Sequence, residues 1–192
     1  MRKLLVALVL CVSVLPACRK KVDPNAKPEE HRALAATCSS VPGQGYARVG
    51  VPGECSKDSD CKRGMNGRCV LIGDMNPAKN RNACEYDDCF TDSDCHAHET
   101  CTCGFRSEIL AVRHRCLPSN CRVDGDCGPN GFCSPSKRKK GSSTVEGWYC
   151  HTEDDECMND ADCAGARKMY EPYCGYSKKK ERWRCDSQKF SD

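Results

Sequence analysis

CSKDSDC at residues 55–61 is the first of four copies of one pattern, Cys-x-x-Asp-x-Asp-Cys. The other copies read CFTDSDC at 89–95, CRVDGDC at 121–127 and CMNDADC at 157–163. Successive copies begin 34, 32 and 36 residues apart. A regular period of this length is typical of tandem repeats in which each repeat is one small structural unit. The sequence therefore predicts four similar modules in a row.

Each predicted module contains four cysteines, two from the repeated stretch and two that follow it. Cys38 and Cys103 stand outside this rhythm, so we expect them to form an extra pair. The four sets are Cys55, Cys61, Cys69 and Cys84; Cys89, Cys95, Cys101 and Cys116; Cys121, Cys127, Cys133 and Cys150; and Cys157, Cys163, Cys174 and Cys185.

Composition favours a fold held by cross-links. The chain has 20 cysteines in 192 residues, a density typical of exported disulfide scaffolds. Large aliphatic residues are too few for a chain of this length to bury one core. The stretches from third to fourth cysteine, such as 70–74 and 144–149, suit two-stranded hairpins. We expect a small disulfide-rich protein of four loop-rich modules, with short β-hairpins, little helix and no single hydrophobic core.

The first residues indicate export. Met1-Arg2-Lys3 is positively charged, and residues 4–15 are apolar but too few to span a bilayer comfortably. Leu15-Pro16-Ala17-Cys18 resembles the lipobox of bacterial lipoproteins. The resemblance implies cleavage before Cys18 and a lipid on that cysteine. In some species an aspartate after the lipidated cysteine retains the lipoprotein in the inner membrane. This chain has Arg19 there, which favours the outer membrane. The alternative to a lipobox is an ordinary signal peptide cut after Ala17.

The chain then divides into seven stretches with distinct compositions. We expect a signal peptide at 1–17, a lipidated cysteine and flexible tether at 18–37 (with a short helix near 28–36), and a Gly/Pro-rich lead-in at 38–54. Module 1 takes residues 55–88, module 2 takes 89–120, module 3 takes 121–156, and module 4 with a tail takes 157–192.

A second resemblance concerns the modules. CRVDGDCGPNGFC at 121–133 resembles the N-terminal cysteine-rich region of Dickkopf-type secreted proteins, and the modules also resemble small epidermal-growth-factor-like units. The likeness implies a secreted disulfide module that binds proteins, and it carries over no functional residue. Four cysteines allow three pairings, all open from the residues alone. The growth-factor-like resemblance implies first-to-third and second-to-fourth.

The repeated aspartates have two readings. Two carboxylates supply fewer oxygens than Ca²⁺ requires, and the spacing of a helix–loop–helix calcium site is absent. We instead expect a structural role, in which the first Asp accepts N–H groups of the following turn and the second adds charge at that turn's start. Calcium binding remains the alternative. The pairs are Asp58/Asp60, Asp92/Asp94, Asp124/Asp126 and Asp160/Asp162.

Other chemistry has little support in the sequence. His96 and His98, with Glu99, could offer zinc or copper ligands, but the repeat commits the neighbouring Cys95 and Cys101 to disulfides. The remaining histidines have no serine or cysteine nucleophile motif near them, and disulfide cysteines are not nucleophiles. We therefore expect neither an enzyme nor a bound cofactor.

Charge is segregated along each module. The four stretches from third to fourth cysteine carry 14 Lys and Arg but only four acids. We expect their tips to form a basic row studded with aromatic rings, suited to an anionic partner. The alternative is that these charges pair with the Asp pairs and Glu153–Glu156. The candidate binding residues are Lys137, Arg138, Lys139, Lys140, Trp148, Lys178, Lys179, Lys180, Arg182, Trp183 and Arg184.

These patterns together predict a membrane-anchored exported lipoprotein that acts as a non-enzymatic binding module. Its expected partner is a protein or an anionic glycan held by the basic hairpin loops. An alternative is a protease inhibitor that presents a basic residue from the 137–144 loop, and another is a surface protein that binds calcium, zinc or copper. Nucleic acid is not among the expected partners, although the net charge of +3 by itself argues neither for nor against it. The oligomeric state is open.

Overall fold

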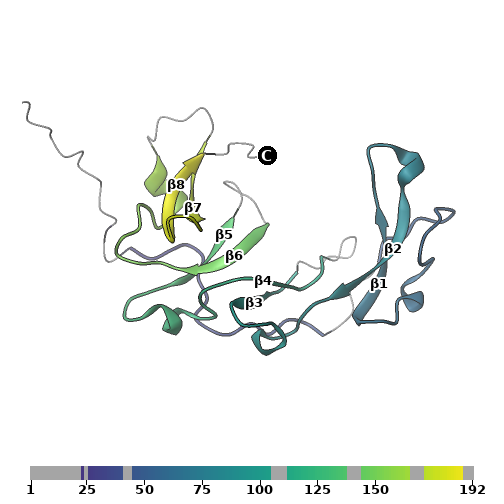
Figure 1. Cartoon of the computed structure of the whole chain (residues 1–192), viewed down its shortest axis with the longest axis horizontal. Helices are drawn as coiled ribbons and strands as arrows, with labels where there is room; N and C mark the ends of the chain where they lie inside the picture. The colour runs from purple at the N-terminus through teal and green to yellow at the C-terminus, as the bar shows by residue number, and fades with distance from the viewer. Residues whose placement is uncertain are drawn as a thin grey trace, which may run out of the picture.

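The computed structural model describes residues 23, 26–40, 45–104, 112–137, 144–164 and 171–187. Within them, eight short strands pair two by two into four antiparallel hairpins, one per module. Figure 1 shows the β1–β2 hairpin by itself at one end, and β5–β6 with β7–β8 at the other. The strands are β1 (Met65–Ile72), β2 (Arg81–Asp87), β3 (Glu99–Thr102), β4 (Arg115–Pro118), β5 (Cys133–Lys137), β6 (Val145–Cys150), β7 (Pro172–Ser177) and β8 (Arg182–Ser187).

The helical content of these residues is limited to short 3₁₀ turns. Four of them coincide with the repeated stretch, and the fifth, η2 (Pro77–Lys79), lies in the β1–β2 connection. No helix in the described part of the chain is long and apolar enough to cross a membrane. The four repeated turns are η1 (Asp58–Asp60), η3 (Asp92–Asp94), η4 (Asp124–Cys127) and η5 (Asp160–Cys163).

Every hairpin has the same register. The third and fourth cysteines lie directly opposite each other, as Cys69 and Cys84 do in β1 and β2. They do not bond to each other. The first cysteine bonds to the third and the second to the fourth, so each turn is stapled to both strands of its own hairpin. The pairs are Cys55–Cys69, Cys61–Cys84, Cys89–Cys101, Cys95–Cys116, Cys121–Cys133, Cys127–Cys150, Cys157–Cys174 and Cys163–Cys185.

The ninth disulfide joins Cys38 to Cys103, the pair that stood outside the repeat. The pairing within the modules is the one implied by the growth-factor-like resemblance. Buried apolar side chains form only small clusters centred on cysteines, such as Cys55, Cys61 and Cys69. The fold class is therefore confirmed: a small disulfide-rich protein of tandem hairpin modules with no common core.

The two aspartates of each repeat form hydrogen bonds that differ from those expected. The second one folds back and accepts the two N–H groups that follow the first cysteine; Asp94 Oδ2 lies 2.8 Å from both the Phe90 and Thr91 nitrogens. These bonds satisfy amides at the start of a 3₁₀ turn and hold the pKa of Asp94 below its usual value. Asp60, Asp126 and Asp162 accept the two equivalent N–H groups in their own modules.

The first aspartate of each repeat reaches instead to the hairpin. Its Oδ1 accepts the N–H of the third cysteine at 2.8–2.9 Å, so it fixes the turn against the first strand. The prediction that it caps its own following turn is wrong, although a structural role for both acids is confirmed. The four bonds are from Cys69 to Asp58, Cys101 to Asp92, Cys133 to Asp124 and Cys174 to Asp160.

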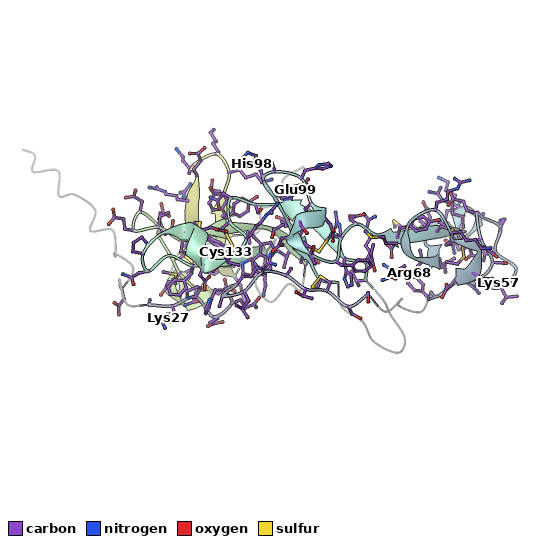
Figure 2. All side chains as sticks on the ribbon, turned by 90° about the horizontal axis from the view of Figure 1, so that it is seen from below. Lys27, Lys57, Arg68, His98, Glu99 and Cys133 are labelled. Atoms are coloured by element: carbon purple, nitrogen blue, oxygen red, sulfur yellow. A yellow bond between two sulfur atoms is a disulfide. The ribbon has the colours of Figure 1, made fainter. Side chains whose placement is uncertain are left out.

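Residues 26–40 and 45–54, which we call the lead segment, run along the modules in reverse order. Asn159 of module 4 accepts the Glu29 N–H and donates to the Lys27 carbonyl. Further along, the Arg32 N–H donates to the Cys133 carbonyl of module 3, and Cys38 N–H donates to Phe90 of module 2. Figure 2 accordingly places Lys27 at the end of the molecule opposite Lys57 and Arg68.

The prediction of a flexible tether is therefore wrong for residues 26–37. No helix forms at 28–36 either, because backbone groups of this stretch bond to the modules. Arg32 is buried, and its guanidinium reaches Thr100 at 2.7 Å and Asp92 at 3.3 Å. The lead segment holds modules 2, 3 and 4 together from the side.

The end of the lead segment covers both edges of the β1–β2 hairpin. Tyr46 bridges to Val70 in β1, and Gly53 bridges to Asn82 in β2. A side chain at Gly45 or Gly53 would overlap atoms of Asp58 or Asn82. The Gly/Pro-rich composition of the lead-in thus permits close contact with module 1, and exposed strand edges are covered.

A buried ionic cluster joins module 1 to module 2. Arg68 is fully buried in β1 and donates to Asp87 at 3.1 Å and to Glu85 at 2.7 Å. Asp87 also accepts the His114 N–H at 2.9 Å. Burial alone would raise the pKa of Asp87, but hydrogen bonds from His114, Asn66 and Arg68 hold it below its usual value.

Candidate anion-binding surface

The aromatic residues of the predicted basic row lie mainly inside the molecule. Trp183 is 3% exposed, its ring stacks on His151 with centroids 4.3 Å apart, and its Nε1 donates to the Cys150 carbonyl. Trp148 is half-buried; its Nε1 donates to Thr102 at 2.8 Å, and Arg32 lies over its ring. Both rings pack between modules. The prediction that they lie on an exposed surface is therefore wrong for Trp183, which is buried, whereas Trp148 is half-buried.

Several of the basic side chains have acidic partners. Arg182 and Arg184 both contact Glu156, at 3.0 and 3.3 Å. Lys137 pairs with Glu30 of the lead segment. For these three side chains, the alternative of internal pairing describes the structure better than a free basic row.

Other basic side chains have no such partner within the described residues. Lys178, Lys179 and Lys180 form the exposed turn between β7 and β8, and Arg115 is exposed at the start of β4. None of the four forms an ion pair with a described acidic group. Their charge is therefore directed to solvent or to a partner.

Arg115 and Lys178 line one depression of about 450 Å³, although they belong to modules 2 and 4. We call it the basic depression. Its lining contains one acidic residue, Glu146, and two basic residues, Arg115 and Lys178. The lining is Arg115, Leu117, Pro118, Ser136, Thr144, Val145, Glu146, Tyr149, Tyr176 and Lys178.

Two stacked tyrosines connect modules 3 and 4 beside this depression. The rings of Tyr149 and Tyr176 are parallel to within 4°, with centroids 3.8 Å apart. Burial is the main cause that raises the pKa of both phenols, and Glu146 adds to it for Tyr149. Tyr149 is 7% exposed, and its hydroxyl has no hydrogen-bond partner among the described residues. It is a neutral donor beside two cations, an arrangement suited to an anionic ligand.

The structure does not assemble the predicted metal sites from described residues. His96 and His98 are exposed, and Figure 2 shows His98 and Glu99 near the middle of the molecule. The described residues bring three or more potential ligand atoms together only at cysteine sulfurs, all of them in disulfides. The paired aspartates accept hydrogen bonds from backbone N–H groups of their own module, which is the structural role expected for them.

Some predicted residues lie outside the described part of the chain. These are Cys18, most of the 137–144 loop proposed for protease inhibition, and the binding candidates Arg138, Lys139 and Lys140. The sequence interpretation also missed the depression itself. Leu117, Pro118 and Tyr149 have no sequence pattern that marks them as lining residues. The depression forms only where modules 2, 3 and 4 pack together.

Comparison with known proteins adds no relative. No protein-family model, curated protein or solved structure matches this chain.

Proposed function

We propose that the protein is an exported lipoprotein, anchored through Cys18, that binds an anionic glycan without catalysing a reaction. Three features support this proposal. The leader ends in a lipobox-like sequence, the disulfides favour an oxidising compartment, and modules 2 and 4 carry cations without an acidic partner in the described part of the chain. Arg19, which stands where an aspartate retains some lipoproteins in the inner membrane, favours the outer membrane as the site of attachment.

The observation that carries the proposed ligand class is the basic depression. Arg115 and Lys178 line it, and both are hydrogen-bond donors with no acidic partner among the described residues. Tyr149 also lines it, and its buried hydroxyl has no hydrogen-bond partner among those residues. The adjacent Lys179 and Lys180 extend the positive charge along the turn. Sulfate, phosphate or uronate groups spaced along a sugar chain suit such a shallow, donor-rich surface.

The test is retention on immobilised heparin, used as a sulfated glycan probe, with the salt concentration at elution as the readout. Neutralising the turn in a Lys178→Gln, Lys179→Gln, Lys180→Gln variant should lower the elution salt. The matched control is Lys57→Gln, Lys62→Gln, Arg63→Gln, which removes the same charge from exposed positions of module 1. Equal losses in both variants would show that only net charge matters and would contradict a defined site.

A single-atom variant sharpens this test. Tyr149→Phe removes a hydroxyl that has no partner among the described residues, so folding should be unaffected. If the hydroxyl donates to a sulfate, affinity should fall about tenfold, as expected for a hydrogen bond to a charged group. Competition by poly-glutamate as strong as that by a heparin oligosaccharide would instead assign the site to an acidic protein.

A further inference from the structure

One of four equivalent carboxylates lacks the second partner that the other three have. In each module the Oδ1 atom of the first aspartate accepts a cysteine N–H. In modules 1, 2 and 3 the Oδ2 atom is bonded to the lead segment. Those bonds are from Gly45 to Asp58 at 2.9 Å, Ala36 to Asp92 at 3.0 Å and His31 to Asp124 at 2.7 Å. In module 4 the lead segment bonds to Asn159 instead, and Asp160 Oδ2 has no partner among the described residues.

Asp160 lines a pocket of about 80 Å³ between modules 3 and 4, together with Pro28 and Glu29 of the lead segment. We call it the junction pocket. Two other polar atoms on buried residues of this pocket, Ser134 Oγ and His151 Nε2, also lack a partner within the described chain. Ser134 is 3% exposed and His151 4%, so bulk water does not satisfy them readily. Buried polar groups without partners are uncommon and indicate a site for something else.

The hydrogen bonds of His151 define what it can offer. Its Nδ1 lies 2.9 Å from Asp155, which also accepts N–H groups of Thr152 and Trp183. A carboxylate bonded in this way is an acceptor, so Nδ1 carries the hydrogen. In the neutral ring Nε2 is then an acceptor. The stacked Trp183 ring fixes the orientation of the imidazole.

Three residues from different parts of the fold line this one pocket, and each carries an acceptor without a partner among the described residues: Asp160 Oδ2, His151 Nε2 and Ser134 Oγ. The charge of the pocket is also suited to a cation. Lys137, the basic residue of its lining, is paired with Glu30, whereas Glu29 and Asp160 have no cationic partner among the described residues. A primary ammonium group is small, positively charged and carries three N–H donors.

We propose that the junction pocket binds a primary ammonium group, with its N–H donors directed to Asp160, His151 and Ser134. Trp183 closes one side as an aromatic wall. The proposal is independent of the basic depression, since it concerns the opposite charge and a different pocket. Either one can fail without affecting the other.

The test uses NMR of the full oxidised chain with labelled histidines, and methylammonium as the probe. Methylammonium should give a saturable shift of the His151 ring resonances, with Nε2 reporting an unprotonated acceptor. Tetramethylammonium, which has the charge but no N–H, should not. A shift equal for both cations, or a protonated Nε2, would overturn the proposal. If neither cation shifts the His151 ring resonances and the ring contacts only water, the pocket holds bound water and the proposal is also overturned.

Variants distinguish a defined site from general acidity. Asp160→Asn keeps an oxygen for the Cys174 N–H but removes the charge, and should weaken methylammonium binding about tenfold. The matched control is Asp58→Asn, the equivalent position in module 1, which should leave binding unchanged. Equal effects of the two variants would contradict the assignment. Titrating glucosamine and Nα-acetyl-lysinamide then distinguishes an amino sugar from a lysine side chain as the source of the ammonium group.

Discussion

The first aspartate of each repeat is the residue on which the modules and the lead segment both depend. Asp92 is the most connected of them: it accepts hydrogen bonds from Cys101, Thr100, Ala36 and Arg32. One carboxylate thus joins a turn, a strand and a segment more than 50 residues away. Burial alone would raise the pKa of Asp92, but these bonds outweigh it and hold the pKa below the ordinary 3.8.

We predict that Asp92→Asn lowers the free energy of unfolding by about 2 kcal/mol near neutral pH, because it removes the charge facing a buried guanidinium. The contribution of a carboxyl with a lowered pKa is complete above its unfolded value and is lost as the pH falls through its folded value. The variant should therefore lose less stability than the native protein below about pH 4. Thermal unfolding followed from pH 7 to pH 2 measures both effects.

The control for this variant is Asp124→Asn, the same position in module 3. Asp124 is more exposed and faces His31 rather than Arg32. Its replacement should cost clearly less at neutral pH. An equal or larger loss would show that the buried Arg32 contact is not what makes Asp92 important.

The side chains of β8 show what sequence interpretation can and cannot supply at this scale. Arg182, Trp183 and Arg184 are adjacent, and their proximity suggested one surface. Side chains alternate between the two faces of a strand, so the tryptophan points inward where the arginines point outward. This alternation could have been predicted from the sequence. The partner of the two arginines, Glu156 at the end of module 3, lies within the acidic stretch that the sequence offered as an alternative, but the sequence alone could not select it.

At the scale of elements, the hairpins were predictable and the lead segment was not. Each hairpin is fixed by cysteines within about 30 residues of each other, a local arrangement that the repeat itself records. The lead segment contacts module 4 across 130 residues of sequence, through backbone groups and single polar atoms. Contacts of this kind leave no periodicity, so residues 26–37 were interpreted as a tether.

The Cys38–Cys103 disulfide should hold the lead segment on module 2. Replacing both cysteines with alanine removes a cross-link across 65 residues. The chain-entropy model gives a ceiling of about 4 kcal/mol for such a loop, and the other disulfides reduce it by restricting the unfolded chain. We predict a lower melting temperature and faster exchange of the backbone amide hydrogens at positions 36 and 38.

A second disulfide variant provides the comparison. Removing Cys163–Cys185 should accelerate exchange in β7 and β8 while Ala36 and Cys38 remain protected. If removal of Cys38–Cys103 leaves exchange in the lead segment unchanged, hydrogen bonds alone hold it in place.

At the scale of the whole molecule, the route of the lead segment determines which end would face a membrane. Lys27, which contacts module 4, is only nine positions along the chain from Cys18, the proposed anchor. Even fully extended, this stretch spans about 30 Å. Module 4 would therefore be nearest the membrane and module 1 farthest from it, although module 1 comes first in the sequence.

This orientation predicts a gradient of distance from the bilayer. Bioorthogonal dyes placed at Lys179 and at Met75, both exposed in hairpin turns, should report it in vesicles that contain a headgroup quencher. Quenching should be stronger at position 179 than at 75 in the lipidated protein. Equal quenching at the two positions would contradict the orientation.

The proposed anion-binding site consists of Arg115 and Lys178, two cations without an acidic partner in the described chain, together with Tyr149 of module 3. Its most direct test is to titrate a short sulfated oligosaccharide into the labelled protein and map the amide shifts. We predict that the largest shifts fall at Lys178–Lys180, Arg115 and Tyr149, and that they diminish as salt is added. No saturable shift, or shifts centred on Lys79 and Arg81 at the far end in module 1, would contradict the account.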